Sequence, residues 1–432
     1  MIFEPEQETL PRERLEALQL DRLRALVDFV KERVPLYAER LAGIESGDLR
    51  SLGDLQLLPL TVKDDLRDTY PLGMLAVPRE RIARIHASSG TTGKPTVVAY
   101  TRDDVDLLGR VNARSLAMAG AEPGMTLHNA YGYGLFTGGL GLHAGGEALG
   151  LAVVPVSGGM TERQLTLIQD LRPDVISCTP SYALTLAQGF RERGVGPDDI
   201  SLRFAVLGAE PWTERMRTEI DAGLGVRSTN IFGLSEIVGP GVSCECVEAR
   251  AGSHVNEDHF LPEIVDPETR EPVAEGEEGV LVITTLTKQA LPLVRYWTGD
   301  ICSLDSSPCS CGRTLVRMGP ILGRTDDMLI VRGVNVYPSQ VGTVLGNVSE
   351  LSPHFGLVVR RLGTLDEVEV LVEVTEDVAP SLTKERIAEL ESRSAALIKD
   401  TIGCTMEVTL VSPGEAPRSE GGKIQRVRDL RG

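Results

Sequence analysis

Short apolar runs rich in β-branched residues alternate with longer amphipathic stretches between about residues 80 and 320. The runs "VISCTP", "RFAVLGAE" and "STNIFG" are separated by stretches with helical spacing such as "SYALTLAQGFRERG" and "TERMRTEIDAGLG". Strands that alternate with helices in this way build a largely parallel sheet with helices packed on its faces. The alternation therefore predicts an α/β fold for this part of the chain.

The pattern differs on both sides of this region. Residues 11–43 carry leucines and valines at helical spacing and predict a helix. Residues 260–286 predict a β-meander with an acidic turn. After about residue 320, "EVEVLVEVTEDV" and "TMEVTLVSPG" predict strands, and "TKERIAELESRSAALIKDTIG" predicts a charged helix. We therefore expect a large N-terminal α/β domain over 1–322 and a small α+β C-terminal domain over 323–432.

Charge and hydropathy exclude several kinds of partner. The chain has 44 basic and 62 acidic residues, a net charge of −18. This balance argues against nucleic acid as a partner, because binding to phosphates requires a basic face. The N-terminus is charged from Glu4, and no run of about 18 apolar residues occurs, so neither a signal peptide nor a membrane span is predicted. We expect a cytoplasmic protein whose 7 cysteines are thiols or metal ligands rather than disulfides.

The segment "SSGTTGK", Ser88 to Lys94, combines glycines, hydroxyls and one lysine. Glycines allow backbone N–H groups to converge on an anion, and hydroxyls and an ammonium add donors. The spacing differs from that of a P-loop, GxxxxGK[ST]. The segment is consistent either with a polyphosphate cradle or with a flexible turn.

Three later stretches favour the polyphosphate cradle. "NIFGLSEIVGPG" offers Phe232 as a flat apolar surface and Glu236 as a carboxylate for Mg²⁺. "YWTGD" ends in Asp300, which can accept two hydrogen bonds from a ribose diol. "APRSEGGKIQRVRD" carries Lys423, able to offset a developing negative charge. Taken one at a time, the three stretches are also consistent with a strand-end turn, a surface carboxylate and a solvated basic tail. Their occurrence together and in this order indicates a nucleotide site.

With these motifs, nearly the whole chain resembles the phenylacetate–CoA ligase family of the acyl-adenylate-forming superfamily. "YGYGLFTGGLG" and "FGLSEIVGPGV" carry the likeness to this family in particular. The resemblance implies an AMP-forming ligase that converts an aromatic carboxylic acid and ATP to an acyl-adenylate and transfers the acyl group to CoA. It also implies a C-terminal domain that rotates between the two half-reactions, and a homodimer.

The resemblance assigns roles to matched residues. Lys423 and Glu236 are the expected catalytic residues, Asp326 is the expected hinge, and Gly333 is expected to face the thiol. The expected ATP and AMP contacts are Ser88, Ser89, Gly90, Thr91, Thr92, Gly93, Lys94, Gly208, Ala209, Glu210, Pro211, Phe232, Gly233, Ser235, Glu236, Asp300 and Arg324.

The aromatic-poor chain places several aromatics around "YGYGLFTGGLGLHAGGE", which predicts a slot for a flat ring. The expected acid-binding residues are Tyr131, Tyr133, Phe136, Gly138, Ala144 and Ile237. One of the two tyrosines is expected to be a core residue instead, and His128 and His143 are interpreted as hydrogen-bonded structural residues.

The chain departs from the family pattern at Ala144, at Gly342, in "YWTGD" and in "SEGGK". The adenylation residues are intact, whereas the pocket rim and the thiolation face are altered. Two alternatives therefore stay open: a substituted benzoate in place of an arylacetate, and transfer to a carrier-protein thiol or an amine, as in secondary metabolism, in place of CoA.

Cysteines form a second group of candidate ligands. Cys246, His254, Cys309 and Cys311 predict a structural zinc site, since four protein ligands leave no open coordination position. Cys244 is an alternative to Cys246, because residues two apart in a strand share a face. The alternative interpretation is reduced thiols with no metal.

Overall fold

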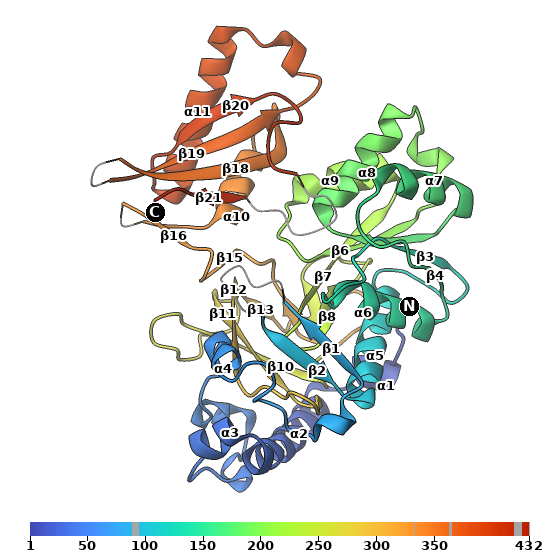
Figure 1. The fold of residues 1–432 in the computed structure, drawn as a ribbon, viewed down its shortest axis with the longest axis vertical. Coiled ribbons are helices and arrows are strands. Elements are labelled where there is room, and N and C mark those ends of the chain that lie inside the picture. Colours follow the sequence, from blue (N-terminus) through green and yellow to red (C-terminus); the bar gives the residue numbers. More distant parts are fainter. Residues whose placement is uncertain (89–94, 333, 363–364, 419–425, 432) are drawn as a thin grey trace.

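The computed structural model describes residues 1–88, 95–332, 334–362, 365–418 and 426–431. A large N-terminal part contains both main sheets, and a small C-terminal part has a sheet and a core of its own (Figure 1). No helix among the described residues is long and apolar enough to cross a membrane.

The N-terminal helices differ from the prediction. The prediction of a single helix over 11–43 was wrong. The structure has two helices, with Val34 between them in extended conformation (φ −114°, ψ 112°). The residue before a proline avoids helical conformation, so Pro35 ends the first helix and begins the next. The helices of this region are α1 (Pro5–Glu8), α2 (Arg12–Arg33), α3 (Pro35–Arg40) and α4 (Lys63–Asp68).

A nine-stranded sheet forms the centre of the large part, in the order β13-β14-β9-β8-β7-β6-β5-β3-β4. The parallel strands are β3 (Thr126–Asn129), β4 (Ala152–Val154), β5 (Val175–Cys178), β6 (Phe204–Gly208) and β7 (Arg227–Leu234). Antiparallel strands continue the sheet: β8 (Gly239–Glu245), β9 (Ser253–Val255), β13 (Leu304–Asp305) and β14 (Arg317–Met318). The predicted α/β fold is confirmed.

Helices occupy the connections between the parallel strands, and an antiparallel pair precedes them. The connecting helices are α6 (Gly138–Leu149), α7 (Thr161–Leu171), α8 (Pro180–Glu192) and α9 (Glu214–Leu224), while α5 (Arg102–Met118) leads from the antiparallel pair to β3. The antiparallel pair is β1 (Arg84–Ala87) and β2 (Val97–Tyr100). The segment "SSGTTGK" therefore connects two paired strands.

A second, antiparallel sheet has the order β10-β11-β12-β15. Its strands are β10 (Phe260–Val265), β11 (Gly279–Thr285), β12 (Tyr296–Cys302) and β15 (Gly323–Arg324). β10 and β11, with β12 beside β11, are successive antiparallel strands and confirm the predicted β-meander. Because β15 pairs with β12, residues 323–324 still belong to this sheet, and the domain boundary after residue 322 stays a prediction.

The C-terminal part has the sheet order β20-β19-β18-β21. Its elements are β16 (Leu329–Val331), β17 (Val334–Val336), α10 (Pro338–Gly346), β18 (Leu351–Leu362), β19 (Leu365–Val374), α11 (Lys384–Ile402), β20 (Glu407–Val411) and β21 (Val427–Asp429). The two strands and the charged helix that the sequence predicted here are β19, β20 and α11. Valines of β18 and β19 pack with Leu390 and Ile398 of α11 in a separate core.

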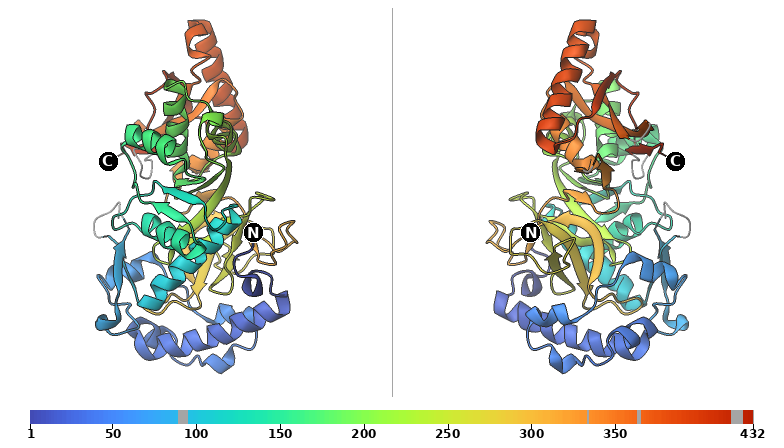
Figure 2. Two further views of the ribbon diagram at one scale, coloured as in Figure 1. Left: turned by 90° about the vertical axis from the view of Figure 1, so that its right-hand side faces the viewer. Right: turned by 90° about the vertical axis from the view of Figure 1, so that its left-hand side faces the viewer.

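The C-terminal part lies at one end of the molecule beside α8 and α9 (Figures 1 and 2). Arg215 of α9 donates from Nη1 to the carbonyl of Val348, at 2.6 Å, and from Nη2 to that of Ser349, at 3.2 Å. Gln188 of α8 donates to Glu376 Oε1 at 3.1 Å. These polar contacts fix how the two parts meet.

Candidate functional site

The carboxyl ends of β6 and β7 gather the residues predicted to hold adenine. Open α/β sheets bind ligands at this edge. A Cβ on Gly208 would lie 2.1 Å from Ile231 O, so the two strands approach as only glycine allows. Ala209 follows with φ +71°, a strained conformation for a residue with a side chain and frequent at functional sites. Glu210 Oε1 accepts from the Ser181 N–H at 2.7 Å and so fixes this turn.

The tight turn between β7 and β8 carries Ser235 and Glu236. A Cβ on Gly233 would lie 1.9 Å from Gly239 O, which explains the glycine. Glu236 is buried, and its Oε1 lies 3.7 Å from Lys63 Nζ at the start of α4. Ser235 Oγ lies 3.4 Å from Thr137 Oγ1. The turn thus holds one carboxylate and one hydroxyl directly after β7, and the Thr137 hydroxyl lies beside it.

The predicted ribose anchor and hinge residue are joined by one arginine. Arg324 Nη1 donates to Asp300 Oδ1 at 2.6 Å, and its Nε donates to Asp326 Oδ1 at 2.8 Å. Burial opposes ionisation of Asp326, but the bonds from Arg324 leave its pKa below the usual value. "YWTGD" departs from the family pattern, and Gly299 within it has φ +81°. A positive φ favours glycine, which explains this residue at the position.

A small recess opens beside Ala209 and Ser235. Burial raises the pKa of Tyr131 well above its usual value, so the side chain is a neutral phenol at pH 7. A Cβ on Gly138 would lie 2.4 Å from the Phe136 ring, so this ring lies directly over the start of α6. The recess is lined by Tyr131, Phe136, Thr137, Gly138, Ala209, Ile231, Gly233, Ser235 and Pro240.

Three of the predicted acid-binding residues do not line this recess. Ile237 is fully buried in the main core. Ala144 faces Gly109 of α5, whose Cβ would lie 3.6 Å from that of Ala144. Tyr133 accepts a hydrogen bond from Asn129 at 2.7 Å and lies 3.2 Å from His143 Nδ1. These three residues have packing or hydrogen-bonding contacts outside the recess, and their part in acid binding stays a prediction.

Two expected features lie outside the described residues. They are the cradle residues from Ser89 to Lys94, and the positions Gly333 and Lys423. Burial lowers the pKa of Arg426, and the nearby charge of Glu210 offsets part of this shift. Arg426 is therefore within electrostatic reach of the turn after β6.

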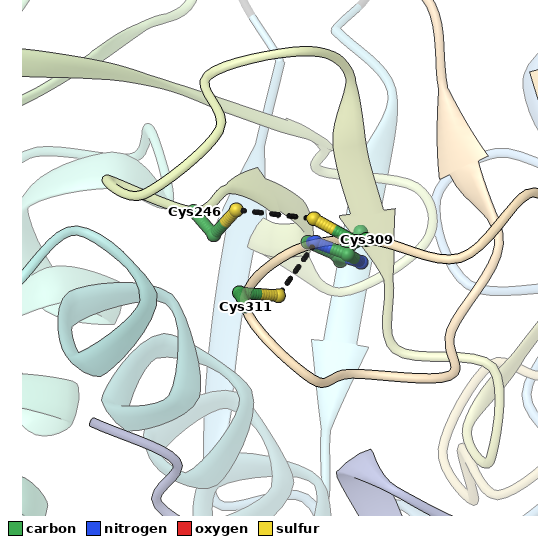
Figure 3. Close-up of side chains that lie close together, drawn as sticks. Cys246, Cys309 and Cys311 are labelled. Carbon is green, nitrogen blue, oxygen red and sulfur yellow. Dashed lines mark hydrogen bonds between the residues drawn. The ribbon is translucent and has the colours of Figure 1, made fainter.

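The structure brings the four predicted metal ligands together (Figure 3). Their ligand atoms lie within 4.8 Å of one another, although the residues come from β9, the end of β8 and the loop after β13. Cys246 Sγ lies 3.6 Å from Cys309 Sγ, and Cys311 Sγ lies 3.4 Å from His254 Nε2. His254 Nδ1 lies 3.3 Å from Leu315 O, which suits a ring that donates there and keeps Nε2 for a ligand.

Cys244 does not join this cluster. Its buried thiol donates to Ser115 O at 3.5 Å, in a different environment from Cys246. β8 ends at Glu245, so the strand alternation that would place both cysteines on one face stops before Cys246. The alternative ligand was therefore wrong, and Cys246 is the residue beside Cys309.

Sequence reasoning missed three residues around the turn 234–238. Lys63 and Lys288 contact Glu236, and Tyr100 contacts the backbone on either side of it. They come from α4, the segment after β11 and the end of β2, far from Glu236 in sequence. No local spacing signal can reveal such contacts, because the fold alone creates them.

Both parts of the chain match models of known protein families. Residues 35–287 match a family model described as AMP-binding enzyme, and residues 333–431 match one described as AMP-binding enzyme C-terminal domain. The phenylacetate–coenzyme A ligase of Thermus thermophilus is 64% identical over 100% of both chains. The chain belongs to the phenylacetate–CoA ligase family. The Escherichia coli member of the family is 49% identical, over 98% of this chain and 97% of its own.

A solved structure relates the fold to a reaction state. 2-Hydroxyisobutyryl-CoA ligase bound to 2-HIB-AMP in its postadenylation state superposes with a TM-score of 0.92 at 27% identity, over 100% of this chain and 92% of that one. The same enzyme in its thioesterification state gives 0.73 at 28% identity, over 99% and 92%. The N-terminal and C-terminal parts of this chain are therefore arranged as in the postadenylation state of that enzyme.

Proposed function

We propose that the protein is an AMP-forming ligase that activates an aromatic carboxylic acid with ATP and transfers the acyl group to CoA. The observation that carries the proposal is full-length identity of 64% to a phenylacetate–coenzyme A ligase. The positions of Gly208–Glu210 and Glu236, directly after the ends of β6 and β7, support it. Phenylacetate is the first acid to test.

In the first half-reaction two anions meet, because the acid is already ionised at pH 7. A carboxylate oxygen attacks the α-phosphorus of ATP, and pyrophosphate leaves. Mg²⁺ offsets phosphate charge when bound, and Glu236, together with ATP oxygens, fits its preference for one or two carboxylates. We assign the adenine to Gly208–Pro211 and Phe232, the ribose to Asp300, and the acid and α-phosphate to Lys423.

The recess beside Ser235 is the proposed site of the aromatic ring. Tyr131 and Phe136 offer apolar faces, and Gly138 leaves room for the Phe136 ring to approach α6. A neutral Tyr131 phenol does not repel a carboxylate. Since Ala144 packs on Gly109, its difference from the family pattern has a structural reason outside the recess.

In the second half-reaction the thiol attacks the acyl carbon, and AMP leaves. We propose that the C-terminal part rotates about Asp326 between the steps, with Lys423 leaving the site. Gly342 departs from the family pattern in the part proposed to face the thiol. It lies against the Phe355 ring, and an added Cβ would be 2.8 Å from that ring. Packing thus accounts for this glycine, which favours CoA over a carrier protein or an amine as acceptor.

We also propose a structural Zn²⁺ held by Cys246, His254, Cys309 and Cys311. Three thiols and one imidazole suit zinc, and the second nitrogen of His254 has a carbonyl partner as bound histidines do. The homodimer remains a prediction from the family resemblance.

ATP–pyrophosphate exchange tests the activation step directly. Purified protein with Mg²⁺, ATP and labelled pyrophosphate is given phenylacetate, hydroxybenzoates or a fatty acid. Exchange that depends on an aromatic acid supports the proposal. Exchange with the fatty acid alone, or with none of the acids, contradicts it.

A further inference from the structure

A buried lysine that the proposed reaction does not use lies against the turn 234–238. Lys288 follows β11 and is 2% exposed. Its Nζ donates to the Glu236 carbonyl at 2.8 Å, the only hydrogen bond of this ammonium within the described part of the chain. Burial lowers the pKa of Lys288 to about 8, against the charges of Asp104 and Glu236, so the group is still charged at pH 7.

Tyr100 supports the same turn from β2. Its hydroxyl donates to Val238 O at 3.0 Å and lies 3.3 Å from Ser235 O. Its ring centroid lies 5.2 Å from Lys288 Nζ, a cation–π contact. Three carbonyls of one turn are thus held by two side chains, while the Glu236 carboxylate lies near Lys63.

The fold gains little from this charge. A buried ammonium is costly unless an opposite charge pairs with it, and no carboxylate within the described residues lies within ion-pair distance of Lys288 Nζ. A methionine would fill a similar volume without that cost. Groups that oppose stability and adjoin a reaction centre are typical of functional sites.

We propose that Lys288 is a positioning residue for adenylation, which holds the Glu236 carbonyl and so fixes the direction in which the Glu236 carboxylate meets Mg·ATP. The role rests on the proposed function, since Glu236 must serve ATP. Lys288 itself contacts neither substrate. Its effect is therefore expected in the use of Mg·ATP and not in the choice of acid.

The test compares Lys288→Met, Lys288→Arg and the control Lys31→Met. Lys31 also donates to a backbone carbonyl, that of Ile44 at 2.8 Å, but it belongs to α2. The measurements are the unfolding temperature, calorimetric binding of Mg·ATP, and KM for Mg·ATP and kcat in pyrophosphate exchange with phenylacetate.

Lys288→Met is expected to keep or raise the unfolding temperature and to lower kcat/KM for Mg·ATP by about 10–100-fold, as for the loss of other supporting contacts at metal sites. Lys288→Arg, which keeps the charge, should recover part of this loss, and Lys31→Met should match the wild type. An active Lys288→Met overturns the proposal. So does a lower unfolding temperature that Lys288→Arg does not restore, because the residue is then structural. An inactive wild-type protein overturns the proposed function instead.

Discussion

Single charges at the nucleotide site carry the proposed chemistry. Lys423 is assigned to the developing negative charge between the acid and the α-phosphate. Loss of one preorganised donor at such a centre typically costs about 10²–10³-fold in rate. We therefore predict that Lys423→Ala loses pyrophosphate exchange by about 10³-fold while ATP still binds.

The measurement is exchange rate together with calorimetric ATP affinity. Lys399, in the last turn of α11, offers a control, because Lys399→Ala removes the same charge from the same part of the protein. Adenylation at the wild-type rate in Lys423→Ala would remove that lysine from the mechanism.

Glu236 is predicted to serve the metal-bound triphosphate through its charge. Glu236→Gln keeps the shape and loses the carboxylate, so we expect KM for Mg·ATP to rise about 10-fold or more, with a higher requirement for Mg²⁺. The exposed Glu268 provides the control Glu268→Gln. A magnesium titration of the exchange rate measures the effect, and identical titration curves for the wild type and Glu236→Gln would contradict the assignment.

The elements around the cysteine cluster meet from distant parts of the sequence. Cys309 and Cys311 lie in the loop after β13, while Cys246 follows β8. A metal there would cross-link this loop to the nine-stranded sheet. We predict that Cys311→Ser loses zinc and lowers the unfolding temperature by ~5 °C or more, since metal bound only to the native state stabilises it.

Metal content by mass spectrometry and thermal unfolding check this prediction. Cys404→Ser removes a buried thiol of the C-terminal part and should leave the zinc content at one per chain. If wild-type protein purified in the presence of zinc contains none, the four side chains are three reduced thiols and a histidine that hold no metal.

Sequence predicted elements better than it predicted contacts. The βα alternation led to β5, β6 and β7 because hydrophobic period is a local property. Pro35 was a local signal too, but the continuous leucine pattern concealed it. The members of the cysteine cluster could be named because few thiols occur, whereas the choice between Cys244 and Cys246 depended on where β8 ends. Lys288 gave no signal, since burial of a lysine is decided by the fold.

Arg215 joins the two parts of the protein in their present arrangement. It donates to two carbonyls just beyond the C-terminal end of α10, where the helix dipole favours a positive charge. One hydrogen bond from a charged group is worth about 1.5–3 kcal/mol, and partial exposure of Arg215 to solvent weakens each of its two. We predict that Arg215→Ala shifts the domain equilibrium about 10-fold away from the arrangement seen here.

The expected result is slower adenylation with little change in the transfer of a preformed acyl-adenylate to CoA. Stopped-flow measurement of each half-reaction separates the two. Arg163→Ala, at an exposed position on α7, is the control. Equal slowing of both half-reactions would mean that Arg215 supports the fold and not one domain arrangement.

The most direct test of the proposed function is a mass-spectrometric product assay with phenylacetate, ATP and Mg²⁺, with and without CoA. We expect phenylacetyl-CoA and AMP in equal amounts when CoA is present, and only a small quantity of acyl-AMP when it is absent. Acyl-AMP that accumulates regardless of CoA would contradict CoA as acceptor. The absence of any product from phenylacetate and related aromatic acids would contradict the activation of an aromatic acid.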